Sequence, residues 1–458
     1  MNQTNNRESA FEIFYSSLKA VDPFDSVKGY ADKIRSVYGS GNFSKLIVIA
    51  FGKAACPMAK AIEDSLGEII DSGIVITKYG HTKVQQRGIA AANYENKNIP
   101  FKNCRSNALL RCCAIFEAGH PFPDENGVKG TDEIINLLKD TDEHTLVVCL
   151  ISGGGSALFV SPYEGITLNE KQVITQLLLN AGADINELNT VRKHLSKVKG
   201  GRLTEIAYPS KIISLILSDV IGDKLDAIAS GPTSPDTTTY ADALKVLEKY
   251  GLIGKAPKNI IDVLREGMKS LIPETPKEGD KIFNNVENII IGSNRIALDA
   301  AKKKAEELGF NTEIISSDLA GEAREAGKWL AIQAKDSRVL RGKDSICLIS
   351  GGETTVTVAG VGLGGRNMEL ALAFAMEIEG VDGLTLLSAG TDGTDGPTDA
   401  AGAIVDAETV KKAKATGLDP LKYLANNDSY NFFKKIDDLF VTGPTGTNVM
   451  DIQIVVIE

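Results

Sequence analysis

The chain has 458 residues, of which 43% are apolar and 24% are charged, a composition that excludes a disordered or fibrous protein. Its formal net charge of −10 at pH 7 argues against non-specific binding to nucleic acid, which depends on the neutralisation of phosphates by Lys and Arg. At this length we expect two domains, because one hydrophobic core rarely serves so many residues.

The N-terminal stretch MNQTNNRESA is polar and lacks the apolar segment of a secretory signal. No apolar run approaches the roughly 20 residues of a membrane-spanning helix. The six cysteines form no CxxC pair, and none belongs to a cluster with metal-ligand spacing. We therefore expect a cytoplasmic protein in a reducing compartment, with no membrane partner.

Short β-branched runs alternate with helical patterns, which is typical of an α/β fold with a parallel sheet covered on both faces. Residues 46–50 (LIVIA) predict a strand, and apolar residues at a 3.6-residue period predict a helix from about Ala55. The other predicted strands are 73–77, 146–152, 212–218, 288–293, 312–316, 346–350, 384–390 and 451–457. Predicted helices between them include 295–308 and 366–378.

The segment GPTSPDTTT (231–239) is rich in turn-forming residues and is the preferred domain boundary. It gives an N-terminal domain of residues 1–239 and a smaller C-terminal α/β domain of residues 240–458. Residues 240–285 are helical and polar, and their composition suits either domain.

Four short motifs occur twice in the same order. CLISGG occurs at 149–154 and 347–352, followed by GGR, a strand that ends in serine with acidic residues behind it, and GPT. Glycine-rich turns recur after buried strands in α/β folds, but turn chemistry alone does not order four motifs alike. We interpret the two sets as related half-sites, one in each domain, that face each other across a cleft.

Two glycine loops in the first half follow predicted strands, where open parallel sheets bind ligands. Lys53 stands after Gly52 at the start of a helix, where free N–H groups already favour an anion. The second loop is Ser152, Gly153, Gly154, Gly155 and Ser156, and its peptide N–H groups suit a polyphosphate. The alternatives are a solvated surface lysine and a tightly packed turn.

A basic run in VRKHLSKVKGGR holds five bases and no acid within eleven residues, namely Arg192, Lys193, Lys197, Lys199 and Arg202. For most of these residues we expect a solvated helix face, the usual meaning of a charge run. One or two of them can still bind nucleotide phosphate, and Lys193 and Lys197 are the candidates.

In the second half, Arg366 opens a predicted helix after two glycines and can clamp a carboxylate or a phosphoryl group bidentately. Asp392 follows the strand 384–390 and can act as general base or metal ligand, although an Asp-Gly turn is the plain alternative. Asp219 and Glu353, each beside a glycine-rich strand end, are candidate metal or water ligands.

Several nucleotide-binding motifs are missing from the sequence. It contains no GxxxxGK[ST] phosphate loop and no protein-kinase HRD or DFG set. The run GVGLGG (360–365) follows no convincing strand, and no acidic residue stands at the expected distance after it. A nicotinamide site is therefore poorly supported.

Taken together, these segments resemble the glycerate 2-kinase family with a MOFRL-type C-terminal domain, the class II glycerate kinases. The resemblance covers nearly the whole chain in unbroken order. Its matching stretches include FGKAACPMAKA, TKYGH (77–81), EAGHPFPDENG (117–127), LISGGGSALF, LNTVRKHLSKVKGGRL, LSDVIGDKLDAIASGPTSPD, ISGGETTVTVAGVGLGGRNMELAL, SAGTDGTDGPTDAAGAIVD and TGPTGTNVMDIQIV.

The resemblance implies a Rossmann-like N-terminal domain, an interdomain active site, ATP with Mg²⁺, and D-glycerate as the acceptor that becomes 2-phosphoglycerate. The functional residues of the family map onto Lys53, Arg366 and Asp392. One departure is a longer polar connection, Thr82–Ile115, for which we expect a surface excursion.

The resulting hypothesis is in-line phosphoryl transfer. Gly153–Gly155 cradle the phosphates, Lys53 and Arg366 neutralise the substrate carboxylate and the migrating phosphoryl, and Asp392 accepts the hydroxyl proton. The chief alternative is an NAD(P)H-dependent hydroxypyruvate reductase, and a second is a nucleotide-binding protein without turnover. The sequence leaves nucleotide and metal preference open, as well as whether the chain forms a homo-oligomer.

Overall fold

The computed structural model describes residues 3–82, 110–341 and 344–458. The chain forms two compact units, each with its own sheet. The parallel-sheet unit comprises Pro23–Ser218 and Asp223–Ile291. The mixed-sheet unit comprises Met1–Asp22, Asp219–Gly222 and Gly292–Glu458.

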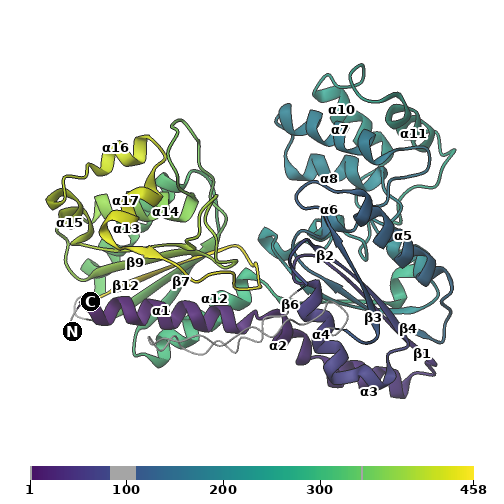
Figure 1. Cartoon of the computed structure of the whole chain (residues 1–458), viewed down its shortest axis with the longest axis horizontal. Helices are drawn as coiled ribbons and strands as arrows, with labels where there is room; N and C mark the ends of the chain where they lie inside the picture. The colour runs from purple at the N-terminus through teal and green to yellow at the C-terminus, as the bar shows by residue number, and fades with distance from the viewer. Residues whose placement is uncertain (1–2, 83–109, 342–343) are drawn as a thin grey trace. The chain divides into compact units, whose positions relative to one another are not determined.

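The parallel-sheet unit is built on a six-stranded sheet in the order β3-β2-β1-β4-β5-β6 (Figure 1). The β1–β2, β1–β4, β2–β3 and β4–β5 pairs are parallel. The central β4 is apolar apart from its first residue and is buried along its whole length, as a sheet covered on both faces requires. The strands are β1 (Lys45–Phe51), β2 (Ser72–Lys78), β3 (Cys113–Ala118), β4 (Thr145–Ile151), β5 (Lys211–Leu217) and β6 (Val286–Gly292).

Helices cover this sheet, and α4 shows why they form. It runs from Ala55 to Leu66 and buries the apolar positions that the 3.6-residue period predicted, which confirms that prediction. The other helices of the unit are α2 (Pro23–Lys28), α3 (Ala31–Ser40), α5 (Glu125–Lys139), α6 (Gly155–Leu158), α7 (Leu168–Asn180), α8 (Ile185–His194), α9 (Arg202–Ala207), α10 (Tyr240–Lys249) and α11 (Lys258–Met268).

The unit boundary differs from the expected one at residue 239. Residues 240–291 belong to the parallel-sheet unit, and the chain leaves that unit at Ile291. The reason is packing: α10 and α11 share a hydrophobic core with α7 and α8, and β6 joins the sheet beside β5. The turn-rich segment 231–239 is therefore a loop inside one unit.

Most of the connection Thr82–Ile115, for which a surface excursion was expected, is not described by the structure. Residues 83–109 lie outside the described residues. The end of the range is not an excursion, because Leu110 is buried and β3, which begins at Cys113, pairs with β2.

The mixed-sheet unit holds a second six-stranded sheet in the order β11-β10-β9-β12-β8-β7. β7 and β8 pair in parallel, but β12 lies antiparallel between β8 and β9, and β10 is antiparallel to β9. The α/β class is confirmed, while the parallel pattern holds here only for β7 and β8. The strands are β7 (Asn311–Leu319), β8 (Ile346–Gly352), β9 (Leu384–Gly390), β10 (Gly402–Asp406), β11 (Leu439–Phe440) and β12 (Asp451–Ile457).

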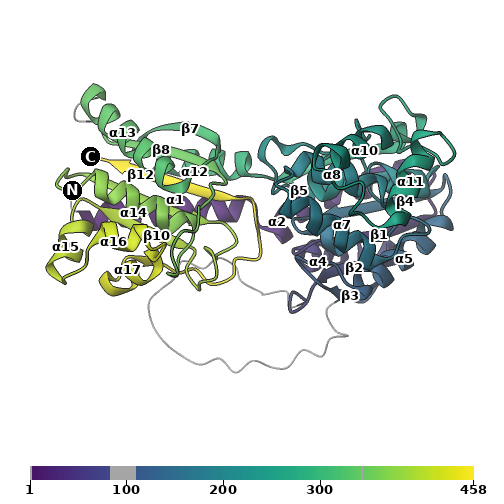
Figure 2. The ribbon, with the colours of Figure 1, turned by 90° about the horizontal axis from the view of Figure 1, so that it is seen from above.

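Two layers of helices cover the mixed sheet, and alternate residues of its strands face one layer or the other (Figures 1 and 2). One layer holds α1 (Gln3–Ala20) and α12 (Asn294–Glu307), which pack together. The other layer holds α13 (Ala323–Arg341), α14 (Arg366–Glu377), α15 (Thr409–Ala415), α16 (Pro420–Ala425) and α17 (Ser429–Ile436).

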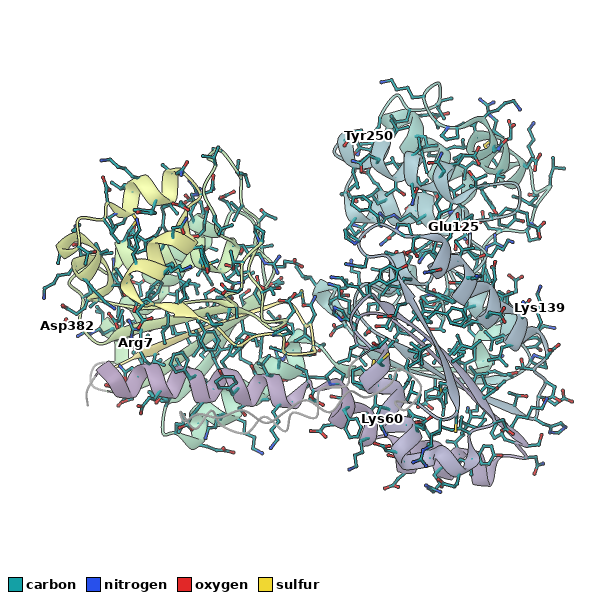
Figure 3. All side chains as sticks on the ribbon, in the orientation of Figure 1. Arg7, Lys60, Glu125, Lys139, Tyr250 and Asp382 are labelled. Carbon is teal, nitrogen blue, oxygen red and sulfur yellow. The ribbon has the colours of Figure 1, made fainter. Side chains whose placement is uncertain are left out.

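The first helix of the chain thus belongs to the unit that is formed mainly by the last third of the chain. Arg7, labelled in Figure 3, forms ion pairs with Asp406 at 2.7 Å and Asp438 at 2.9 Å. Phe14 is fully buried in the core with α12 and the sheet. Among the described residues, no helix is both long enough and apolar enough to cross a bilayer.

Candidate active site

Two loops meet where the strand order of the parallel sheet reverses, beyond the carboxyl ends of β1 and β4. Lys53 N donates to Gly153 O over 2.9 Å, and Ala54 N donates to Ser152 Oγ over 3.0 Å. Gly52 has a φ of 127°, and a Cβ there would stand 2.2 Å from Ser152 Oγ. Because open α/β sheets bind ligands at this reversal point, the two glycine loops form one candidate site.

Lys53 is half-buried beside the imidazole of His120. A Cβ on Gly154 would stand 3.2 Å from Lys53 Cγ and 3.0 Å from His120 Cδ2, so both side chains pack on this glycine. Burial, then the charges of Lys53, Lys78 and His81, lowers the pKa of His120 to about 4. Burial also lowers the pKa of His81. Both imidazoles are therefore neutral at pH 7.

The glycine loop, residues 152–156, runs from the end of β4 into α6. Within the described residues, the N–H groups of Gly153 and Gly154 donate to no protein acceptor. The hydroxyl of Ser152 accepts from Ala54 N and is only 2% exposed, so it holds the two loops together. The loop therefore offers peptide N–H groups for an anion, while Ser152 has a structural partner already.

The basic run after α8 is not a solvated helix face, and that expectation is wrong for three of its five residues. Lys193, Lys199 and Arg202 are each at most 6% exposed. Lys193 Nζ lies 3.2 Å from Asp236 and 3.4 Å from Asp226, so its charge is balanced inside the unit. Lys193, Lys199 and Arg202 can be buried because each has polar partners inside the unit.

The other predicted phosphate ligand of this run, Lys197, is half-buried and lines a cavity of about 340 Å³ together with Ser161 and Tyr163. Of the five bases, the one that contacts the glycine loop is Lys199, whose Nζ lies 3.4 Å from Ser156 Oγ. The sequence analysis chose Lys193 and Lys197 as the phosphate ligands of this run and did not choose Lys199, the residue that contacts the loop.

In the mixed-sheet unit, Arg366 is the first residue of α14 and Gly365 is its N-cap. Arg366 Nε and Nη2 donate to the two carboxylate oxygens of Asp451 over 2.6 and 2.9 Å, and Nη1 donates to Glu353 over 2.6 Å. Burial would lower the pKa of Arg366, but the two carboxylates outweigh it and raise that pKa. The guanidinium is thus held in one orientation by a bidentate pair.

Two further carboxylates lie in the loop after β9. Asp392 is half-buried, and its Oδ1 accepts from both N and Oγ1 of Thr394 at 3.0 Å. A Cβ on Gly390 would stand 3.3 Å from Asp392 Oδ1 and 3.5 Å from Asp451 Oδ1, so these two carboxylates flank the same glycine. The structure therefore brings Asp392 close to the Arg366–Asp451 pair.

Asp395 has a different task, because it caps α14. Its oxygens accept from Asn367 N at 3.1 Å and Met368 N at 2.8 Å. Burial raises the pKa of Asp395 to about 7, although these two hydrogen bonds oppose the shift. Asp395 thus positions the helix end that carries Arg366.

The two predicted metal ligands, Asp219 and Glu353, both belong to the mixed-sheet unit. Desolvation raises the pKa of Glu353, Arg366 opposes this, and the charges of Asp451 and Asp219 raise it further. Asp219 and Glu353 are therefore near enough to repel each other. Across the described parts of the chain, no group of three or more His, Cys, Asp or Glu side chains has the geometry of a metal site.

The two sets of repeated motifs share local geometry. Arg202 and Arg366 are each the first residue of a helix with glycine as N-cap, and Gly231 and Gly396 of the GPT motifs both have a φ of 62°. In each set the GGR loop packs against the GPT loop. Their chemistry differs, because Arg202 donates to neutral oxygens whereas Arg366 binds carboxylates.

Four residues of the two sites were not singled out as site residues by sequence reasoning: His81, His120, Lys199 and Asp451. The first two stand in the stretches TKYGH and EAGHP, and Asp451 stands in the terminal stretch TNVMDIQ. Each of these stretches was noted for its resemblance, but a single histidine or aspartate in it has no spacing that indicates its partner.

Two family models match the chain. One is described as a domain of unknown function, DUF4147, and matches residues 9–265, and the other is the MOFRL family, which matches residues 346–451.

Relatives match over nearly the whole length. The D-glycerate 2-kinase of Thermotoga maritima is 47% identical over 98% of this chain and 97% of its own length. A protein of Agrobacterium vitis that carries the name of a hydroxypyruvate reductase is 37% identical over 100% of this chain and 95% of its own. The crystal structure of the glycerate kinase from Thermotoga maritima matches with a TM-score of 0.85 and 46% identity, covering 99% of this chain and 100% of that chain.

Proposed function

The chain belongs to the glycerate 2-kinase family with a MOFRL-type C-terminal domain, and on this basis we propose that it transfers the γ-phosphoryl group of ATP to D-glycerate, giving 2-phosphoglycerate and ADP. The observation that supports this proposal best is the glycine loop. It presents two peptide N–H groups that have no acceptor among the described residues, beside Lys53, at the ligand-binding edge of the parallel sheet. Such an arrangement suits phosphate oxygens.

In the parallel-sheet unit, Gly153 and Gly154 donate their N–H groups to phosphate oxygens, and the Lys53 ammonium neutralises the transferring phosphoryl group. Because phosphoryl transfer is catalysed mainly by positioning and by electrostatic stabilisation, fixed donors and a lysine are sufficient for this part. The neutral His120 packs beside Lys53 and does not compete for the negative charge.

In the mixed-sheet unit, Arg366 binds the carboxylate of the acceptor. Three of the five guanidinium N–H groups are used by Asp451 and Glu353, which leaves two for a substrate. Asp392 accepts the proton of the acceptor hydroxyl as the new O–P bond forms and the bond from phosphorus to the bridging oxygen of ADP breaks.

The reaction also requires a divalent cation, and the oxygen ligands present fit Mg²⁺. This ion is usually held by one or two carboxylates together with substrate phosphates, and it neutralises phosphate charge. Asp219 and Glu353 are the carboxylates we assign to it. Burial, followed by the charges of Asp451 and Asp219, raises the pKa of Glu353, and a bound cation would stabilise the charged form of this carboxylate.

ATP is an intracellular substrate, so we assign the enzyme to the cytoplasm. The five cysteines in the described residues are all free thiols, which is consistent with a reducing compartment.

A hydroxypyruvate reductase is the second candidate, because two relatives, 37% and 38% identical, carry that name. The structure gives it less support. The run GVGLGG (360–365) lies in an irregular segment rather than directly after a strand, whereas a dinucleotide fingerprint joins a strand to a helix.

Two assays on the purified protein separate the candidates. ADP release with D-glycerate, ATP and Mg²⁺ is expected, with the phosphate on the 2-hydroxyl by ³¹P NMR. NADH or NADPH oxidation with hydroxypyruvate is expected to be absent, and reductase activity without ADP release would reverse the assignment. Lys53→Ala is expected to lower kcat/KM by about 10²–10³-fold, the usual effect of removing one fixed electrostatic donor.

A further inference from the structure

Lys199 lies at the centre of a buried polar network beneath the glycine loop. It stands in the turn between α8 and α9 and is 1% exposed. Its Nζ lies 3.4 Å from Ser156 Oγ and donates to Ala229 O over 3.2 Å. Ser156 Oγ lies 2.9 Å from Ser230 Oγ, which donates to Asn189 Oδ1 over 3.1 Å. The network therefore connects the glycine loop to the loop after β5 and to α8.

The charge of this lysine has no counter-charge in the protein. Among the described residues, no carboxylate lies within ion-pair distance of Lys199 Nζ, although Lys193 in the same run has two. The charged groups that act on the pKa of Lys199 are both cations, Lys171 and Arg192. Burial, reinforced by these two cations, lowers the pKa of Lys199 well below its ordinary value. A buried lysine without a counter-charge is an incomplete site, because buried charges are ordinarily paired and an unpaired lysine is pushed toward its neutral form.

We propose that Lys199 is a positioning residue for the phosphoryl donor: it fixes the glycine loop through Ser156, and the phosphates of the bound nucleotide supply its missing counter-charge. Nζ is too deeply buried to touch a ligand directly, so it acts through the Ser156 hydroxyl and through its charge. This inference rests on the proposed kinase function for the identity of the anion.

Binding of a nucleotide is expected to change the protonation of Lys199. A polyanion at the loop stabilises the charged form of the lysine and raises its pKa, so Lys199 takes up a proton when nucleotide binds. In the charged form, Nζ donates to Ser156 Oγ and to Ala229 O, and the Ser156 hydroxyl then donates onward. Nucleotide binding is therefore expected to be coupled to proton uptake at pH values between the pKa of Lys199 in the free protein and its pKa in the nucleotide complex.

The test compares the wild type with Lys199→Met and Lys199→Arg in the full-length protein. Lys199→Met is expected to raise KM for ATP about 10-fold or more, with KM for D-glycerate changed less than about 2-fold, and Lys199→Arg is expected to recover part of the loss. Titration calorimetry with Mg²⁺ and a non-hydrolysable ATP analogue, in two buffers of different ionisation enthalpy at each of several pH values from 7 to 10, measures the proton uptake. The uptake is expected in the wild type and should be absent in Lys199→Met.

Lys171→Met is the matched control. Lys171 is 5% exposed, its Nζ donates to Leu195 O over 3.2 Å, and it also lacks a carboxylate partner among the described residues, but it does not contact the glycine loop. This variant is expected to keep the KM for ATP. Because the charge of Lys171 helps to lower the pKa of Lys199, the KM for ATP and not the proton uptake is the readout of this control. If Lys199→Met fails to fold, Ser156→Ala removes the connecting hydroxyl and is expected to raise KM for ATP selectively.

Failure of this proposal differs from failure of the proposed function. Unchanged KM for ATP and unchanged proton uptake in Lys199→Met would overturn the role of Lys199 while glycerate phosphorylation stands. Absence of phosphorylation in the wild type would overturn the kinase assignment, whereas the calorimetric comparison would still measure the coupling of Lys199 to a bound nucleotide.

Discussion

At the scale of single residues, the buried carboxylate of Asp451 has the Arg366 guanidinium as its counter-charge. Asp451 is 1% exposed, and both of its oxygens accept from the guanidinium. Removing one partner of a buried ion pair leaves an uncompensated charge, whereas replacing both partners by neutral groups is often tolerated. The pair therefore orients Arg366, and the loss of either partner alone is expected to destabilise the fold.

This dependence predicts different outcomes for two Arg366 variants. Arg366→Met is expected to abolish turnover and to lower the free energy of unfolding by about 3 kcal/mol. The double variant Arg366→Met with Asp451→Asn is expected to regain most of that stability but no activity. Urea unfolding and ADP release measure the two effects, and a double variant as unstable as the single one would contradict the ion-pair argument.

His120 predicts a pH dependence of stability. Its folded pKa of about 4 lies below the roughly 6.5 of an unfolded histidine, so between these values the unfolded chain binds a proton that the folded chain does not. The free energy of unfolding therefore falls as pH falls from about 6.5 to 4, by up to about 3 kcal/mol from this residue.

His120→Gln removes this contribution. Its free energy of unfolding is expected to decline less than that of the wild type between pH 6.5 and 4. Above pH 7 the two free energies are expected to change with pH in the same way. Urea unfolding at several pH values provides the measurement, and parallel curves for the two proteins would refute the assigned direction.

At the scale of elements, the contact between the loops after β1 and β4 depends on Gly52. A Cβ there would meet Ser152 Oγ at 2.2 Å and Ser152 O at 2.5 Å, and the φ of 127° is one that other residues rarely adopt. Gly80 has a φ of 79° as well, but its Cβ would meet nothing within 4 Å. Alanine at Gly80 would therefore introduce backbone strain alone, whereas alanine at Gly52 would introduce both strain and a steric clash.

Gly52→Ala is expected to lower the free energy of unfolding by more than about 2 kcal/mol and to weaken nucleotide binding, because the two loops must move apart. Gly80→Ala is expected to cost only about 1 kcal/mol, the strain of a left-handed alanine. Thermal unfolding and KM for ATP provide the comparison. Equal losses in the two variants would show that the contact with Ser152 is unimportant.

At the scale of the whole molecule, the two units do not follow the chain in simple order. The first 22 residues belong to the mixed-sheet unit, where α1 buries Phe14 against the core and Arg7 pairs with Asp406 and Asp438. Trp329, the one tryptophan of the sequence, lies in α13 of the same unit and packs against its core. The fluorescence of Trp329 therefore reports the unfolding of the mixed-sheet unit, to which α1 also belongs.

Phe14→Ala is expected to lower the stability of the mixed-sheet unit by about 3–5 kcal/mol, the usual cost of deleting a buried aromatic ring. The unfolding transition followed by Trp329 fluorescence should move to lower urea concentration. Arg7→Ala is expected to move it in the same direction, because Asp438 is 1% exposed and loses a counter-charge. An unmoved transition in Phe14→Ala would show that α1 does not stabilise this unit.

The sequence predicted the strands of both sheets well wherever an apolar run had its own turn signals, as at β1, β4, β8, β9 and β12. It missed β3, β10 and β11. β3 follows a long polar stretch, and β11 has only two residues, so neither shows a period that can be recognised. Among the candidate site residues, Lys53, Arg366 and the glycine loop could be proposed from the sequence because each stands at a strand end or a helix start, which the local pattern reveals.

By itself, the sequence determined the α/β class, the main strands and helices, and the loops that carry the candidate chemistry, because these depend on local periodicity and on glycine at tight turns. Only the tertiary structure decided the boundary between the units, the antiparallel place of β12, and the partners of Lys193, Lys199 and Arg366. These depend on contacts between residues up to hundreds of positions apart, such as Arg7 with Asp438, and no local pattern of residues specifies which distant groups will share a core or a charge.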